Sequence, residues 1–283
     1  MMLLNRSLVR FLLLSCSTFA IGADASTWEV VGSSSMSKMY MKPLIYEGLS
    51  NNGEHFIMNS KNNIFLINST DYSPIMSTIN AIPNALREQG YNHLGDCQYY
   101  NGQLYFAVEE STFSCPSIFV YNVHDDDFVF NRQMPQPVQS HMPWVAIDTD
   151  TISSVASVYV YSSEFDNATE LFAYDSETLE FSHSVPLSIT LSSVQGGAFY
   201  KGLLHVGVNT GDTVYSIDVS TGKVDTVVVQ NPVESGHGRS DEYEFEGLTF
   251  LDLTHLGMGR MHNTGNHWSH PTEMGTVVHC DLV

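Results

Sequence analysis

The sequence predicts an all-β protein of the β-propeller class, and three observations support this prediction. Helical periodicity is nearly absent, since the only helix-like stretch, residues 81–89, is limited to a short turn by Pro83. An apolar run closed by Asn or Asp recurs five times, and a segment of small residues precedes each run. A four-stranded antiparallel unit repeated roughly every 50 residues is typical of a propeller blade.

The recurring apolar run is expected to be the third strand of each unit. Asn and Asp at the end of a strand favour a turn, so each run should lead into a fourth, outer strand. The five runs are Ile64–Asn68, Ile118–Asn122, Leu171–Asp175, Val214–Asp218 and Val277–Asp281.

The segments of small residues are expected to be first strands, because the strands nearest the axis of a propeller are crowded. They are Glu47–Leu49, Leu94–Asp96, Trp144–Ala146, Gln195–Gly197 and Glu246–Leu248. Asn52-Gly53 and Asn101-Gly102 follow two of them, and Asn-Gly between apolar runs is a strong hairpin signal leading to a second strand.

Five units predict a five-bladed propeller, with six blades as the alternative and a stacked β-sandwich as the competing fold. The last unit ends without a fourth strand, and Trp28–Val31 is a strand-like segment that no unit uses. We expect this segment to pair with Val277–Asp281 and to close the ring, which removes two free strand edges.

The first 25 residues are predicted to be a secretory signal peptide. Arg6 and Arg10 precede an apolar run, Phe11–Ile21, and Ala23-Asp24-Ala25 has the small residues of a cleavage site. The run is shorter than the roughly 20 apolar residues that a membrane-spanning helix needs. We therefore expect residues 26–283 to form one secreted, extracellular domain that is not inserted in a membrane.

Export makes a disulfide bond and glycans possible. Cys97, Cys115 and Cys280 follow the signal peptide, and the first two, on one predicted blade, are the expected bridge. Two glycosylation sequons lie in turn-like stretches and begin at Asn68 and Asn167.

Composition excludes some classes of function. The 283 residues carry a net charge of −20, which argues against nucleic acid as a partner because phosphates would be repelled. The hydrophobic content of 43% excludes a disordered acidic tail. An acidic surface permits cation binding, and a small molecule is the expected partner.

The loops that enter first strands and leave second strands emerge on one face of a propeller, around a central funnel. Their polar residues make three candidate sets. The catalytic candidates are His93, His141 and His262, because an imidazole can act as a general base. The substrate-binding candidates are Trp144, Gln195, Glu109 and Glu164, because aromatic and polar groups line small-ligand pockets. The metal candidates are Glu47, Asn209, Glu246 and Asn263, whose oxygens suit Ca²⁺.

Each of these sets also has an alternative interpretation in which the residues are only structural. Polar loop residues often cap strand ends and satisfy backbone groups. Trp144 could equally be packed between blades.

The motifs Glu47-Gly48-Leu49, Glu246-Gly247-Leu248 and Val194-Gln195-Gly196-Gly197 resemble those of a broad group of secreted or periplasmic propellers. That group includes calcium-dependent lactonases, phosphotriesterases, phytase-like proteins and five-bladed calcium-dependent nucleotidases. The resemblance implies a calcium ion in the funnel, held at Glu47, Asn209, Glu246 and Asn263.

Three functions are compatible with these patterns. The first is an enzyme for a small molecule, such as an ester or lactone hydrolase assisted by a metal. The second is a non-enzymatic acidic glycoprotein that binds a ligand, matrix or mineral. The third is a cyclisation enzyme that works without a metal.

Overall fold

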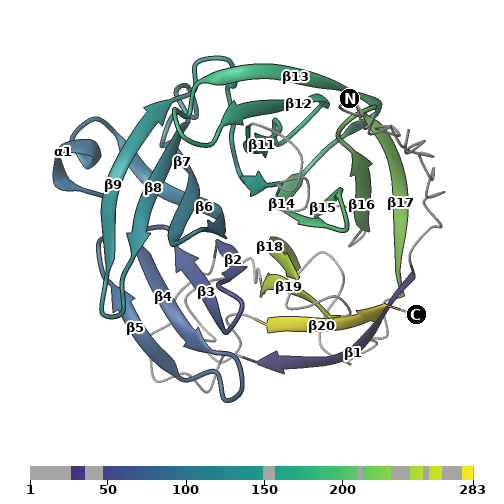
Figure 1. The fold of residues 1–283 in the computed structure, drawn as a ribbon, viewed down its shortest axis with the longest axis horizontal. Helices are drawn as coiled ribbons and strands as arrows, with labels where there is room; N and C mark the ends of the chain where they lie inside the picture. The colour runs from purple at the N-terminus through teal and green to yellow at the C-terminus, as the bar shows by residue number, and fades with distance from the viewer. Residues whose placement is uncertain are drawn as a thin grey trace, which may run out of the picture.

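The computed structural model describes residues 27–35, 47–148, 157–209, 213–230, 243–250, 255–262 and 276–282. The predicted signal peptide lies outside these residues, and so does Asn263. The chain forms β-sheets arranged around a central axis, which confirms the all-β propeller (Figure 1). Among the described residues, no helix is long and apolar enough to cross a membrane.

Three sheets have four strands each, ordered along the chain from the axis to the rim. The first contains β2 (Gly48–Asn51), β3 (His55–Ser60), β4 (Asn63–Asn68) and β5 (Pro74–Thr78). The second contains β6 (Tyr91–Tyr100), β7 (Gln103–Glu110), β8 (Ser117–Val123) and β9 (Phe128–Pro135). The third contains β10 (Ala146–Ile147), β11 (Tyr159–Ser162), β12 (Ala168–Asp175) and β13 (Phe181–Leu191).

The remaining eight strands form one continuous sheet, in the order β14-β15-β16-β17-β1-β20-β19-β18. Its first half contains β14 (Val194–Tyr200), β15 (Leu203–Val208), β16 (Thr213–Asp218) and β17 (Lys223–Gln230). Its second half contains β1 (Thr27–Ser35), β18 (Tyr243–Phe250), β19 (His255–His262) and β20 (Thr276–Leu282).

The prediction of five blades, or alternatively six, is therefore wrong, because the strands of the described residues form four sheets. The fourth and fifth sequence repeats are fused, since β1 pairs in parallel with β17 on one edge and antiparallel with β20 on the other. A parallel pairing of this kind joins distant parts of the chain and leaves no signal in the local sequence.

The expected pairing of the N-terminal strand with the last strand is confirmed. Trp28 lies opposite Leu282, and Val30 lies opposite Cys280. The two ends of the chain are thereby joined by backbone hydrogen bonds, so neither β20 nor β1 is left as a free edge there.

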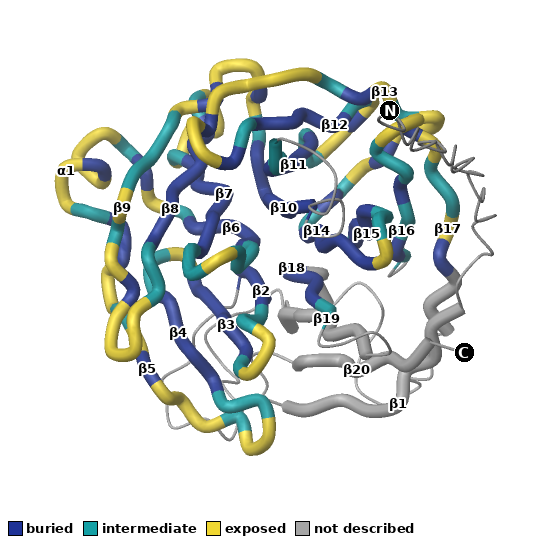
Figure 2. Tube along the Cα trace, in the orientation of Figure 1, coloured by how far each residue is buried: buried dark blue, intermediate teal, exposed yellow. Residues whose placement is uncertain are grey.

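The five expected third strands are β4, β8, β12, β16 and β20, and the small-residue segments lie in or directly before β2, β6, β10, β14 and β18. The inner strands are the buried ones, and exposed residues lie mainly on the outermost strands and turns (Figure 2). The predicted helical turn is α1 (Asn84–Arg87), which begins directly after Pro83.

The core fills the spaces between neighbouring sheets. Between the first two sheets, Ile57 and Ile64 belong to the same buried cluster as Phe106 and Phe119. Between the second and third, Ile118 and Val120 belong to a cluster with Val160 and Tyr174. This sheet-to-sheet packing of apolar side chains holds the ring together, because burial of each large side chain contributes about 1.5–3 kcal/mol.

The expected Cys97–Cys115 disulfide is not formed, and both cysteines are free thiols. Cys97 is fully buried in the core between the first two sheets. Cys115 lies beside the other end of β6, where its sulfur is 3.9 Å from the hydroxyl of Tyr91. Tyr91 and Cys97 are six positions apart on β6, which places them roughly 20 Å apart at the rise of a strand.

Candidate acid–base site

Two glutamates and two histidines lie together on one face of the ring, at the ends of strands of the first three sheets. Glu47 directly precedes β2, His93 is near the start of β6, and Glu109 is near the end of β7. His141 lies in the segment that joins β9 to β10. We call these four residues the Glu–His cluster, and we call this side of the ring the site face.

Backbone contacts between the sheets bring these segments together. The N–H of Leu94 donates to the carbonyl of Lys61, and the N–H of Asp96 donates to the carbonyl of Pro143. Gly95 makes the second contact possible, because a Cβ atom there would lie 2.4 Å from the Pro143 oxygen. The segment carrying His93 is therefore held between those carrying Glu47 and His141.

The side chains of the cluster alternate between acid and imidazole. His93 Nε2 is 3.1 Å from Glu47 Oε2, and its Nδ1 is 3.9 Å from Glu109 Oε2. His141 Nε2 is 3.2 Å from Glu109 Oε1. Because an ionised carboxylate only accepts hydrogen bonds, the tautomer of His141 that fits its contact with Glu109 carries the proton on Nε2 and leaves Nδ1 as an acceptor.

Burial differs between the acids and the imidazoles. The Glu47 and Glu109 side chains are 8% and 3% exposed, whereas those of His93 and His141 are 25% and 30% exposed. The carboxylates are thus fixed inside the protein while the rings reach solvent. This is the arrangement of a general base whose ring is oriented by a buried acid.

Further contacts hold Glu109 and the backbone of His141 in place. Glu109 Oε1 also accepts a hydrogen bond of 2.7 Å from the N–H of Met142. Glu164, two residues after the end of β11, accepts hydrogen bonds from the N–H groups of Ser140 and His141 and from the Ser140 hydroxyl. Glu164 therefore positions the His141 segment, and its expected role in substrate binding stays a prediction.

Two phenylalanines flank the His141 ring. The ring centroid of Phe113 is 4.8 Å from that of His141, and the ring centroid of Phe165 is 5.1 Å from that of His141. Phe113 is 45% exposed and has a φ of 52°, which is uncommon for a bulky residue. The accessible imidazole is therefore bordered by apolar rings that limit how a ligand can approach it.

Two buried acceptors beside the cluster have no hydrogen-bond partner among the described residues. They are Glu47 Oε1 and Asn59 Oδ1. Lys61 Nζ is 3.9 Å from Glu47 Oε1, which is an ion-pair distance but too long for a hydrogen bond. Asn59 uses its Nδ2 to donate to the carbonyls of Leu94 and Gly95.

Trp144, expected from the sequence as a pocket wall or as a packed residue, is packed. Its side chain is fully buried, its Nε1 donates to the Ser163 hydroxyl, and its ring lies against Gly197 of β14. It fills the space between the third sheet and the eight-stranded sheet.

The other predicted site residues are placed as follows. Gln195 is half-buried in β14, where a bulge falls between its neighbours Val194 and Gly196. Glu246 is buried in β18, and Asn209 directly follows β15. His262 ends β19, where only the backbone is described, and Asn263 lies outside the described residues.

The calcium site therefore stays a prediction. Within the described part of the chain, His, Cys, Asp and Glu side chains form no group of three or more that could hold a metal ion.

Sequence patterns missed Phe113, Phe165 and the positioning role of Glu164. The two phenylalanines stand in loops without any pattern, so only the folded structure brings them to His141. Lys61 is one of the few cations in an acidic chain, and that rarity is what marks it in the sequence.

Fold and site together define a β-propeller with acid–base groups at one end of its ring. The chain resembles the crystal structure of glutaminyl cyclase from Myxococcus xanthus, with a TM-score of 0.62, 11% identity, and coverage of 91% of this chain and 98% of that one. It also aligns with the PQQ-bound aldose sugar dehydrogenase from Streptomyces coelicolor over 89% of this chain and 98% of that one, at 9% identity. The TM-score of 0.47 for that second pair is too low to support an argument.

No protein-family model matches the chain, and no curated protein matches it. The comparisons therefore support a propeller architecture but no particular family. They do not support membership of the calcium-dependent group that the blade motifs resemble.

Proposed function

We propose that this protein is an enzyme that transfers an acyl group of a small molecule to a nucleophile, with His141 as the general base. One observation carries the proposal: two part-exposed imidazoles are held by two buried carboxylates in a continuous Glu–His cluster. General acid–base groups of this kind typically contribute 10²–10⁴-fold to a rate.

The reaction would use the free Nδ1 of His141. This nitrogen takes a proton from the attacking nucleophile and returns it to the leaving group, and the acyl–heteroatom bond breaks as the new bond forms. Glu109 holds the ring and stabilises the imidazolium through the 3.2 Å contact with Nε2. His93, between Glu47 and Glu109, is the second proton carrier of the cluster.

The identity of the nucleophile separates two candidate reactions. If water attacks, the reaction is hydrolysis of an ester or a lactone. If the substrate supplies its own amine, the reaction is a cyclisation, such as ring closure of an N-terminal glutaminyl residue with release of ammonia. The backbone similarity to a glutaminyl cyclase favours testing the second reaction, although at 11% identity that similarity establishes the fold alone.

The test is an assay of the purified protein with a short-chain lactone, a nitrophenyl ester and a glutaminyl peptide, following acid or ammonia release. We expect turnover of at least one substrate, and a loss of 10²-fold or more in kcat for His141→Gln and for Glu109→Gln. His183→Gln is the control, because His183 is exposed near the start of β13, away from the cluster. Turnover that persists in His141→Gln would contradict the proposal.

Two further outcomes would decide between the remaining alternatives. Activity that is lost on treatment with a chelator and restored by Ca²⁺ would support a calcium site at Glu47, Asn209, Glu246 and Asn263. No turnover of any substrate would favour the non-enzymatic acidic glycoprotein. In both cases we propose that the protein is exported, which N-terminal sequencing of the protein recovered from the medium would test.

A further inference from the structure

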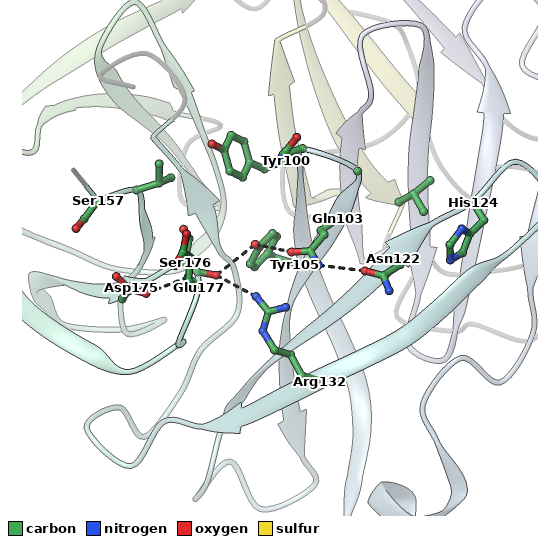
Figure 3. A pocket seen from close by; sticks show the side chains of 14 residues that line it. Tyr100, Gln103, Tyr105, Asn122, His124, Arg132, Ser157, Asp175, Ser176 and Glu177 are labelled. Atoms are coloured by element: carbon green, nitrogen blue, oxygen red, sulfur yellow. Dashed lines mark hydrogen bonds between the residues drawn. The ribbon is translucent and has the colours of Figure 1, made fainter. Parts of the chain in front are cut away.

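A cavity of about 630 Å³, separate from the Glu–His cluster, lies between the second and third sheets (Figure 3). It is lined by the turn between β6 and β7, at Asn101 and Gly102, and by His124 between β8 and β9. The Glu–His cluster lies where first strands begin and second strands end. These turns lie at the other ends of the same strands, so the cavity opens on the opposite face of the ring.

Arg132 of β9 provides the charged donor of this cavity. Its Nη2 donates a hydrogen bond of 3.1 Å to the carbonyl of Ser176, which directly follows β12 of the third sheet on the other side of the cavity. Its Nε is buried and has no hydrogen-bond partner among the described residues. The guanidinium lies among Ser176, Tyr105 and Gln103 (Figure 3). Because this Nε is buried, the other N–H groups of the guanidinium are the ones that a molecule in the cavity would use.

The charges around the cavity disfavour an anion. Arg132 contributes one positive charge, whereas Asp175 and Glu177 line the wall contributed by the third sheet. The whole chain carries a net charge of −20, which adds to the repulsion. The guanidinium of Arg132, among these acids, therefore suits a neutral oxygen such as that of a hydroxyl group.

The rest of the lining can exchange hydrogen bonds with hydroxyl groups. Gln103 donates from Nε2 to Asn122 Oδ1, and the Tyr105 hydroxyl donates to Gln103 Oε1 or to the carbonyl of Ser176. Amide and phenol groups both donate and accept, as a hydroxyl partner requires. Tyr100, which is half-buried, adds an aromatic ring against which the C–H face of a sugar could pack.

We propose that this cavity binds a neutral polyhydroxylated molecule of the size of a mono- or disaccharide, with Arg132 as its anchoring donor. The volume lies within the range of roughly 300–1,000 Å³ that is usual for small-molecule sites. The proposal does not depend on the activity proposed for the site face, which lies at the other ends of these strands.

The experiment is saturation-transfer NMR and calorimetry on the full chain with glucose, galactose, maltose and trehalose as neutral probes, and with succinate and inorganic phosphate as anionic probes. We expect saturable binding of at least one sugar, a dissociation constant at least ten times larger in Arg132→Gln, and no change in His141→Gln. The proposal is overturned if no sugar binds saturably, if Arg132→Gln binds sugar as well as the unchanged protein does, or if succinate or phosphate binds more tightly.

A second pair of variants keeps the test decisive, because Arg132 also joins the two sheets through Ser176. Arg132→Lys retains the positive charge but loses the planar set of guanidinium N–H donors, so it should bind sugar as weakly as Arg132→Gln. Tyr100→Leu retains an apolar side chain but loses the ring and should weaken binding in a protein that melts normally. Unaltered sugar binding in both variants would exclude this cavity as the site.

Discussion

Asp96 and Gly197 lie 101 residues apart in sequence, yet the Asp96 carboxylate accepts a hydrogen bond of 3.2 Å from the Gly197 N–H. Its other oxygen accepts one of 2.9 Å from the N–H of Leu49. One fully buried carboxylate of β6 thereby connects β2 and β14, which belong to two other sheets. Burial raises the pKa of Asp96 well above its ordinary value, and the hydrogen bonds from backbone N–H groups oppose this rise.

The first prediction is that Asp96→Ala destabilises the protein by about 2–5 kcal/mol, because at least two buried N–H groups lose their acceptor. Asp96→Asn should also be destabilising, since an amide nitrogen would then face one of these N–H donors. Urea denaturation checks both variants. Asp125→Ala, at an exposed turn, is the control and should change the free energy of unfolding by less than about 0.5 kcal/mol. Equal midpoints for Asp96→Ala and Asp125→Ala would show that Asp96 does not connect the sheets.

The second prediction concerns the contact between Gly197 and Trp144. A Cβ atom at Gly197 would lie 2.6 Å from Trp144 Cε3, so Gly197→Ala should destabilise by about 1–3 kcal/mol through overpacking. In a Trp144→Leu background, where the ring is absent, the same substitution should cost less. A double-mutant cycle measured by thermal or chemical denaturation gives the coupling directly. Additive effects of the two substitutions would contradict the contact.

The strand pattern of this protein could be predicted because it is local. An apolar run closed by Asn or Asp, and a Gly turn between apolar runs, mark a strand and its end within a few residues. The closure of the ring also followed, since Trp28–Val31 and Val277–Asp281 both lacked a partner. The number of sheets did not follow, because the pairing of β1 with β17 joins segments that share no pattern.

The sequence could predict on which face of the ring the candidate site residues lie, but it could not predict which side chains contact one another. The rule that first-strand starts and second-strand ends meet on one face placed His93, His141 and Glu109 on the same face of the ring. That rule has no information on side-chain reach, so it could not separate the Glu–His cluster from Trp144, which points into the core. In the structure Glu47 Oε2 contacts His93, and the assignment of Glu47 to a calcium ion stays a prediction.

The third prediction is a difference in reactivity between two thiols. Burial raises the pKa of the Cys97 thiol well above its ordinary range, with a smaller contribution from Asp96, so little reactive thiolate forms. Cys115 is partly exposed, beside Tyr91. Brief alkylation of the native protein, followed by peptide mapping, should label Cys115 and spare Cys97. Recovery of a peptide in which the two cysteines are linked, without reduction, would contradict the structure.

The last prediction is a loss of stability in acid that depends on His205. Its side chain is buried in β15 against the Phe250 ring, with centroids 5.1 Å apart, and its Nδ1 is 3.2 Å from the carbonyl of Leu203. Burial lowers the pKa of His205 from 6.5 to about 4, and the contact with Leu203 opposes this only in part. The ring is therefore neutral in the folded protein at pH values where it is protonated in the unfolded chain.

The unfolded chain binds more protons than the folded one between pH 6.5 and about 4, so this contribution to stability is complete above pH 6.5 and declines as the pH falls through that interval. The difference between the two pKa values corresponds to at most about 3 kcal/mol. His205→Phe, which keeps a ring against Phe250, should lose less stability than the unchanged protein when urea denaturation is compared at pH 7 and pH 4.5. His183→Gln, at an exposed position of β13, is the matched control. If His205→Phe and the unchanged protein lost the same free energy of unfolding over this interval, His205 would not be the residue responsible.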